Sequence, residues 1–338
     1  MRKIPSELLF SIALILILVL MNTGCSKKEP GFKYSVGTFP DSIYNLQDIN
    51  TIYDDYNIAL PLIEGQLPVI FSSNRNSQGS QFDLVVGEVT FNFDKNSGDF
   101  EVKSNMSIDP FLSALVSKAN SSGNDFGPNR LFNSSDGYEY LIVSSQNSTG
   151  LLDMFYMKYL PQLGINIPVF PVPIPLKLLN SVGNDAYFSF DNENRTVYFT
   201  SDRDGDYDIY SQVKPASVNL GTWFESDFAN SLQVDSLNTS SDEKCPFIHD
   251  EIMFLTSNRP GGLGGYDLYY SVFKDDKWGI PVNMGPEINT SADEFRPVIG
   301  SQSGYTNVFM IFSSNRPGGK GGFDLYFRGF DLPENYQN

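Results

Sequence analysis

The sequence is poor in three kinds of residue on which many functional sites depend. Its 338 residues include 2 cysteines, 1 histidine and only 23 Lys and Arg, against 40 Asp and Glu. So few cysteines exclude a network of disulfide bonds, and the fold must depend on its packed core. The formal net charge of −17 disfavours direct binding to nucleic acid or to anionic lipid, because like charges repel.

The two residues best suited to chemistry, His249 and Cys245, lie in contexts that do not favour catalysis. His249 stands beside Asp250 and Glu251 in a predicted surface turn. Ser-His-Asp catalysis needs an imidazole between a nucleophile and an acid, and the sequence has no nucleophile-elbow pattern. Cys245 lies among apolar strand residues and is predicted to be a small core residue. The sequence therefore predicts no catalytic residue, no cofactor and no enzymatic activity.

The N-terminus has the pattern of a secretory signal. A basic start precedes an almost wholly apolar run over residues 8–21, which is short for a membrane-spanning helix of about 20 residues. Small residues then precede Cys25, and the segment resembles the lipobox of bacterial lipoproteins. This resemblance implies that residues 1–24 are a signal peptide, that Cys25 carries a lipid, and that residues 25–31 form a short tether. An ordinary signal peptide or membrane anchor with an incidental cysteine is the alternative.

The rest of the chain is rich in aromatic residues, many of them in alternating runs that favour β-strands. One pattern recurs five times: an apolar strand, Ser-Asn-Arg or a variant of it, a glycine-bearing loop, and an aromatic-Asp-apolar-aromatic segment. It is clearest at residues 254–269 and 312–326. Subtraction gives separations of 70, 55, 59 and 57 between the aspartates of the five copies, which are Asp83, Asp153, Asp208, Asp267 and Asp324. Self-similarity at this spacing predicts repeated copies of one structural unit.

Each unit is predicted to contain four short strands, because another strand pattern precedes each copy and a further one follows several of them. Four-stranded antiparallel units repeated around an axis are the blades of a β-propeller. We therefore predict an all-β, five-bladed propeller over residues 32–338. The last copy lacks an outer strand, so residues 32–40 are predicted to supply it and close the ring. A six-bladed ring is the alternative, because the strand pattern is irregular over residues 90–135.

Three segments, 254–269, 278–294 and 312–326, resemble the WD40-like repeat of TolB-type β-propellers. The resemblance implies a role in the bacterial envelope with protein partners. With the N-terminal pattern, it predicts a non-enzymatic lipoprotein anchored in the bacterial outer membrane through Cys25, whose propeller is a scaffold for a protein or glycan. The alternatives are a glycan-active enzyme similar to glycoside hydrolases and a lectin-like surface module. A hydrolase would need carboxylates from different blades that converge in the central channel.

Residues that recur in most copies are expected to serve the blade, whereas a residue found in one copy is a functional candidate. The recurring arginines are Arg75, Arg203, Arg259 and Arg316. We interpret them as structural residues that pair with the recurring aspartates nearby, because four copies of one catalytic site in a ring are not expected.

One acidic loop is unique to the third copy and is a candidate calcium site. Its carboxylates are Asp202, Asp204, Asp206 and Asp208. Ca²⁺ takes several hard oxygen ligands, and alternating carboxylates around a glycine resemble a calcium loop. The glutamate that ends a twelve-residue calcium loop is absent, because Val213 stands there. An Asp- and Gly-rich turn without metal is therefore the competing interpretation.

Two further segments depart from the repeat. Residues 165–179 are strongly apolar and contain four prolines. They are either an irregular outer strand of the second blade or an exposed apolar surface that meets a partner or the membrane. Residues 110–118 are predicted to be a short helical insertion between blades. The face that carries the glycine-rich loops 261–265 and 318–322 is predicted to be polar and acidic and to bind a protein or a glycan.

Overall fold

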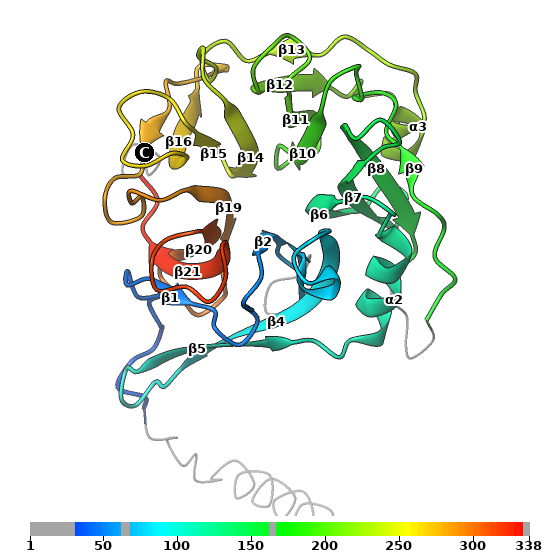
Figure 1. Cartoon of the computed structure of the whole chain (residues 1–338). Coiled ribbons are helices and arrows are strands. Elements are labelled where there is room, and N and C mark those ends of the chain that lie inside the picture. Colours follow the sequence, from blue (N-terminus) through cyan, green and yellow to red (C-terminus); the bar gives the residue numbers. More distant parts are fainter. Residues whose placement is uncertain (1–30, 62–67, 162–166, 334–338) are drawn as a thin grey trace, which may run out of the picture.

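The computed structural model describes residues 31–61, 68–161 and 167–333, which form a ring of five antiparallel β-sheets around a central axis (Figure 1). From inner to outer strand, the first three blades are β2 (Asp55–Ala59), β3 (Pro68–Ser73), β4 (Asp83–Phe93) and β5 (Phe100–Met106); β6 (Asp125–Asn133), β7 (Tyr138–Gln146), β8 (Leu152–Tyr159) and β9 (Ile174–Pro175); and β10 (Asp185–Phe190), β11 (Thr196–Ser201), β12 (Asp208–Val213) and β13 (Leu232–Gln233). The fourth blade is β14 (Glu243–His249), β15 (Ile252–Ser257) and β16 (Asp267–Lys274) with two short strands, β17 (Lys277–Trp278) and β18 (Val282–Asn283), and the fifth is β19 (Glu294–Gly300), β20 (Val308–Ser314), β21 (Asp324–Phe330) and β1 (Tyr44–Asn45). The predicted all-β propeller with five blades is confirmed.

An N-terminal strand closes the ring, as the sequence predicts, but it lies a few residues later than expected. The strand is β1, in which Tyr44 pairs with Phe327 and Asn45 with Tyr326 of β21. Within the predicted segment 32–40, residues 37–40 run beside the last blade without adding a strand to it. The Phe39 N–H donates to Asn307 Oδ1 at 2.8 Å. Pro40 has no N–H to donate, so regular pairing cannot continue through it.

A second contact between the first and last blades comes from the long hairpin of β4 and β5, which extends from the first blade toward β1 (Figure 1). Phe39 is at the centre of this contact, stacked on Tyr305 with ring centroids 3.9 Å apart. Phe91 and Phe100 of the hairpin pack edge-on against Phe39, and Phe100 also stacks on Phe327. Aromatic pairs of this kind contribute about 0.5–1.5 kcal/mol each beyond their buried area.

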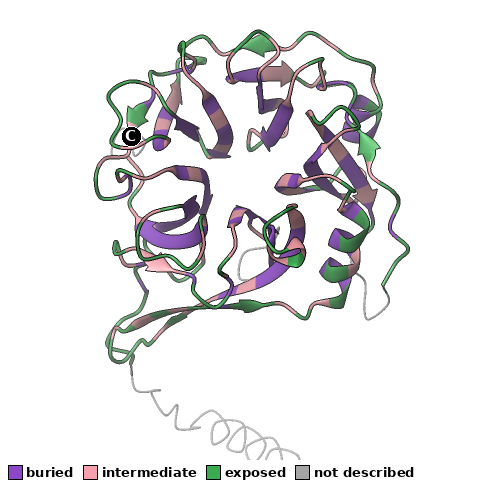
Figure 2. Ribbon diagram, in the orientation of Figure 1, coloured by how far each residue is buried: buried purple, intermediate pink, exposed green. Residues whose placement is uncertain are grey.

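Burial follows the position of a strand within its blade. The second strands are the most deeply buried, and β15 and β20 are buried at every residue, because neighbouring blades cover both of their faces. Outer strands such as β9 and β13 are exposed, and Figure 2 shows this change from buried centre to exposed rim. The hydrophobic core therefore consists of layers of side chains, each packed between two neighbouring blades.

Among the described residues, two α-helices lie on the outer parts of the blades. Helix α2 (Pro110–Ala119) is the predicted insertion between the first two blades. Asp109 caps it by accepting a hydrogen bond from the Leu112 N–H at 2.8 Å, and Pro110 takes the first turn, where no N–H is needed. Its buried residues, including Phe111 and Leu115, pack against side chains of β4, β7 and β8. Helix α3 (Leu220–Phe224) lies in the third blade, and its Trp223 and Phe224 pack against Phe190 and Phe188.

The proline-rich segment supplies the predicted outer strand of the second blade and also exposes apolar side chains, whereas its contact with a partner or the membrane stays a prediction. Ile174–Pro175 is β9, the outer strand of the second blade. Phe170, Leu176 and Leu178 of the same segment are buried, whereas Val169 is 99% exposed. The buried side chains thus hold the segment on the blade, and the exposed ones leave apolar groups at the surface.

The predicted signal peptide 1–24, Cys25 and most of the predicted tether 25–31 lie outside the described residues. Among the residues that the structure describes, no helix is both long enough and apolar enough to cross a membrane.

Candidate functional site

Every inner strand begins with a buried carboxylate. The five are Asp55, Asp125, Asp185, Glu243 and Glu294, and each is 0% exposed. In four blades a serine at or next to the end of the second strand donates its hydroxyl to this carboxylate, as Ser257 does to Glu243 at 2.7 Å. Burial of this kind is tolerated because the charged oxygens are hydrogen-bonded.

The recurring arginines neutralise four of these carboxylates. The ion pairs join Arg75 to Asp55, Arg203 to Asp185 at 2.6 Å, Arg259 to Glu243 at 3.1 Å and Arg316 to Glu294 at 3.0 Å. Each guanidinium also donates to a backbone carbonyl oxygen of the linker that leads into the same blade. The expected pairing with the recurring aspartates is wrong, because these arginines bind the start of the inner strand.

The recurring aspartates instead hold the loops that precede them. Asp267 accepts hydrogen bonds from the backbone N–H groups of Leu263 and Gly264, and Asp324 accepts equivalent bonds from its own loop. A Cβ added to Gly264 would lie 1.9 Å from the carbonyl oxygen of Ala292 in the linker to the next blade. The glycine-rich loops are therefore needed for close contact between blades. The other three aspartates bond to side chains: Asp83 to Gln81, Asp153 to Asn147 and Asp208 to Gln233.

One hydrogen bond of the same kind joins each blade to the blade before it, which gives five such bonds around the ring. The side-chain oxygen of the residue just before each inner-strand carboxylate accepts from a backbone N–H of the preceding blade. The pairs are Asp54 with Phe323, Asn124 with Phe82, Asn184 with Leu152, Asp242 with Tyr207 and Asp293 with Tyr266. We call the face of the ring that carries these bonds and the loops 74–82, 147–151, 202–207, 258–266 and 315–323 the latch face. Three of the five acceptors are aspartates, Asp54, Asp242 and Asp293, so these acidic side chains hold neighbouring blades together.

The four aspartates of the candidate calcium loop do not come together as a metal site. Asp202 accepts from Asn184, and Asp204 accepts from the Tyr210 hydroxyl. In the described part of the chain, no group of three or more His, Cys, Asp and Glu side chains is arranged to hold a metal. Burial, together with Asp206, Glu243 and Asp204, raises the pKa of Asp208 to about 7.

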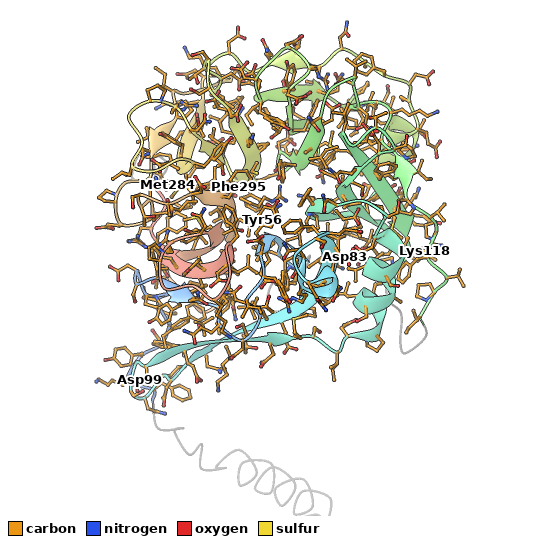
Figure 3. The ribbon with its side chains drawn as sticks, viewed as in Figure 1. Tyr56, Asp83, Asp99, Lys118, Met284 and Phe295 are labelled. Atoms are coloured by element: carbon orange, nitrogen blue, oxygen red, sulfur yellow. The ribbon has the colours of Figure 1, made fainter. Side chains whose placement is uncertain are left out.

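The centre of the latch face is aromatic, whereas the sequence predicts a polar and acidic face. Tyr56 and Phe295 point toward the axis of the ring in Figure 3. Tyr56 packs against Phe82, Phe126 and Phe323 with ring centroids 5.1, 5.7 and 5.5 Å away. Aromatic rings from three blades therefore line the channel at this end.

The middle of the channel contains one unusual backbone position in each blade. Two residues after each inner-strand carboxylate, the backbone is left-handed and the strand bulges, at Asn57, Gly127, Tyr187, Cys245 and Arg296, with φ between 51° and 60°. Left-handed backbone is costly for most residues other than glycine. The Arg296 guanidinium lies 5.5 Å from the centre of the Tyr187 ring, so side chains from different blades meet here. Cys245 is fully buried, as predicted, and burial raises the pKa of its thiol to about 12.

A pocket of ≈320 Å³ opens at the opposite end of the channel from the latch face. Phe91, Phe247 and Phe309 contribute apolar walls, and the polar side chains come from Asn129, Arg130, His249, Arg296, Ser301 and Gln302. Arg130 pairs with Glu139 at 3.1 Å. The described residues that line the pocket include two guanidinium groups and an imidazole but no carboxylate.

His249 is not the exposed turn residue that the sequence predicts. It is the last residue of β14, it lines this pocket, and its side chain is 18% exposed. Burial lowers the pKa of its imidazole, and Asp250, 3.8 Å away, only partly offsets this effect. His249 is therefore neutral at pH 7 and can accept a proton.

Arg296 is the pocket residue that sequence reasoning missed. The signal becomes visible when the five inner strands are aligned on their first carboxylate. The third position then reads Asn57, Gly127, Tyr187, Cys245 and Arg296, and only one of these residues is charged. All five residues at this position differ from blade to blade, and Arg296 is the functional candidate among them because it carries a charge.

Comparison with known proteins gives a likeness of structure but not of sequence. No family model matches the chain, and no curated protein matches it. A thermostable family-43 glycoside hydrolase is similar, with a TM-score of 0.51 and 12% identity over 90% of this chain and 94% of that one. An α-L-arabinofuranosidase from Lactobacillus brevis has a TM-score of 0.52 and 9% identity over 87% and 94% of the two chains. The RS223 β-xylosidase has a TM-score of 0.50 and 9% identity over 87% and 96%.

These neighbours correct two predictions. They share the five-bladed fold, but they are glycoside hydrolases and not TolB-type proteins, so the WD40-like resemblance is supported only for the propeller. The prediction that the chain is not an enzyme is wrong, because the ring taken as a scaffold has the fold of these hydrolases over almost its whole length. At identities of 9–12%, the likeness itself is one of fold.

Proposed function

We propose that the chain is a glycan-active enzyme that binds its substrate in the channel pocket opposite the latch face. The observation that carries the proposal is the likeness to glycoside hydrolases over about nine-tenths of the chain. A lectin-like module that binds glycan without turnover is the second candidate, and it uses the same pocket.

The composition of the pocket supports binding of a sugar. Its volume, ≈320 Å³, lies within the range of small-molecule sites, which is about 300–1,000 Å³. Apolar side chains such as Phe247 and Phe309 can cover the C–H faces of a sugar ring, while Asn129 and Gln302 can bond to its hydroxyl groups. Arg130, Arg296 and His249 add groups that can hold charge or move a proton.

The carboxylates of the inner strands are poorly placed for the acid and base of hydrolysis. Asp55, Asp185, Glu243 and Glu294 are buried and bound to arginine. Asp125 has no arginine, and burial raises the pKa of its carboxyl, but the Ser145 hydroxyl and the Ser121 N–H occupy its oxygens. The residue of the pocket best suited to accept a proton is His249, because it is neutral at pH 7.

The test is turnover of polysaccharides by the purified full-length chain. We expect release of reducing ends from at least one polysaccharide in a panel of arabinan, arabinoxylan, xylan and pectin. A His249→Gln variant that loses this activity while it still binds would support a role for the pocket. Binding of a glycan without turnover would favour the lectin-like function, and neither binding nor turnover would contradict both.

We further propose that a lipid on Cys25 anchors the chain in the bacterial outer membrane, where it meets envelope glycans. The N-terminal pattern supports this proposal, and the net charge of −17 makes adhesion to anionic lipid by charge alone unfavourable. In cells that produce the wild-type chain, we expect the protein in the outer-membrane fraction, and we expect Cys25→Ser to move it out of that fraction. A wild-type chain found in the soluble fraction would contradict the anchor.

A further inference from the structure

The guanidinium of Arg296 is a buried charge without a matching carboxylate among the described residues. The residue is 1% exposed, and its Nη2 donates to the carbonyl oxygen of Pro128 at 3.0 Å. Its Nε and Nη1 have no hydrogen-bond partner in the described part of the chain. By contrast, Arg75, Arg203, Arg259 and Arg316 each bind a buried carboxylate. An unpaired buried charge costs several kcal/mol, so Arg296 needs an anion that the described residues do not supply.

The groups around Arg296 indicate the side from which an anion can reach its guanidinium. It lines the pocket together with Arg130 and His249, and the three residues come from β19, β6 and β14. On the other side of Arg296 are the ring of Tyr187 and the neutral thiol of Cys245, neither of which offers a negative charge at pH 7. The pocket is therefore the direction from which an anion can reach the two unbonded nitrogens.

The charges in the pocket indicate the charge of the ligand. Arg130 is balanced by Glu139, and burial keeps His249 neutral at pH 7. Arg296 alone remains unbalanced, which leaves one positive charge for a monoanion. The apolar walls formed by Phe91, Phe247 and Phe309 favour a ligand with a larger body than a small inorganic anion.

We propose that this pocket is a binding site for a uronic acid, whose carboxylate is held by Arg296 and whose ring lies against the apolar wall. A carboxylate is a monoanion whose oxygens accept the N–H bonds that Arg296 leaves unused. The choice of a sugar acid over another carboxylate rests on the proposed function, whereas the anion site itself rests on Arg296. The uronic acid can be a free monosaccharide or a unit of a polysaccharide.

The test is calorimetric titration of the purified full-length chain with galacturonate and glucuronate, alongside galactose and glucose as neutral counterparts. We expect the uronates to bind at least about tenfold more tightly than the neutral sugars, since charge-assisted hydrogen bonds are the stronger ones. Arg296→Met keeps an apolar stem but removes the charge, and it should reduce uronate affinity by about tenfold or more. Arg195→Met, which removes an exposed arginine of the third blade, is the control and should leave the affinity unchanged.

A second measurement keeps the proposal testable if the Arg296 variant folds poorly. Galacturonate should raise the melting temperature of the wild-type chain, whereas equal concentrations of galactose or sodium chloride should not. Oligogalacturonides that bind more tightly than galacturonate would identify a polymer as the ligand, and equal affinity would identify the monosaccharide. Equal binding of uronate and neutral sugar, or tighter binding of inorganic phosphate, would overturn the proposal.

The outcomes also separate this proposal from the proposed enzymatic function. Uronate binding that depends on Arg296, without turnover of any polysaccharide, would support the anion site and contradict the enzyme. Turnover of a neutral polysaccharide without uronate binding would support the enzyme and overturn the anion site.

Discussion

Asp54 and Phe323 are 269 residues apart in the sequence, yet the Oδ1 atom of Asp54 accepts the backbone N–H of Phe323 at 2.8 Å. This bond joins the first blade to the last. The other four bonds of its kind join blades that the chain also connects directly through a linker. The joint between Asp54 and Phe323 depends instead on noncovalent contacts and on β1, which adds only two residue pairs.

Asp54→Ala should therefore destabilise the ring. We expect a loss of about 1–3 kcal/mol in the free energy of unfolding, because the variant leaves the N–H of Phe323 without its charged acceptor. Urea denaturation followed by tyrosine fluorescence measures this loss. Asp99→Ala, at an exposed position in the hairpin between β4 and β5, is the control and should have little effect. Equal stability of the two variants would show that the bond is not needed for closure.

Phe39→Ala should weaken the same joint by a larger amount. Phe39 is 1% exposed and contacts aromatic rings from the first and last blades, including Phe91 and Tyr305. Removal of a buried phenylalanine ring leaves a cavity and typically costs about 3–5 kcal/mol. The melting temperature should fall far more than in Phe132→Ala, which removes a ring that is 47% exposed. A similar fall in both variants would contradict the central role of Phe39.

The position of the closing strand shows what the sequence can and cannot predict. The repeat predicts the number of blades, and it predicts a strand from the N-terminus because the last copy lacks an outer strand of its own. The residues 32–40 were the wrong choice, since the equivalent of Val282–Asn283 is Tyr44–Asn45. The decisive similarity is a side-chain contact: Asn50 donates to Asn45 as Asn289 donates to Asn283. This contact becomes evident only when the strands are placed.

The partners of the recurring arginines could not be chosen from the sequence for a geometric reason. In the fourth blade, Ser257 of the second strand pairs in register with Glu243 on one side and with Asp267 on the other. Arg259 follows Ser257 by two residues, so both carboxylates lie near it. Separation in sequence favours Asp267, but the loop N–H groups already occupy that carboxylate, and Arg259 binds Glu243. A charged residue that recurs in most repeats thus predicts that an ion pair forms, but it does not identify the carboxylate that it binds.

The pH dependence of stability should contain a contribution from Asp208. Its pKa in the folded chain is about 7, above the ordinary value of 3.8, because burial and neighbouring carboxylates disfavour its charge. The folded state then holds a proton more tightly than the unfolded state. This contribution to stability is fully present below about pH 4 and is lost as the pH rises through about 7.

Asp208→Asn should remove this dependence, because the amide stays neutral. We expect the variant to be more stable than the wild type at pH 8 by about 1 kcal/mol, since solvent screens part of the repulsion. At pH 4, the two proteins should differ little. Melting temperatures measured from pH 4 to 8 would show a wild-type curve that falls relative to the variant, and parallel curves would contradict the shifted pKa.

His249 should contribute a pH dependence of the opposite sign. Burial lowers the pKa of its imidazole in the folded state, so the unfolded chain binds the proton more tightly. Its contribution to stability is present above the ordinary histidine pKa of about 6.5 and is lost as the pH falls through the lower pKa of the folded state. His249→Gln cannot titrate, so it should lose less stability than the wild type between pH 7 and 5.

The comparison of these two variants separates histidine from the carboxylates. Between pH 7 and 5, the stability of the wild type relative to His249→Gln should fall, whereas its stability relative to Asp208→Asn should rise. Because His249 is the only histidine, no other imidazole can produce the first effect. If the stability of the wild type relative to His249→Gln did not change between pH 7 and 5, the pocket would not hold its histidine in the neutral form.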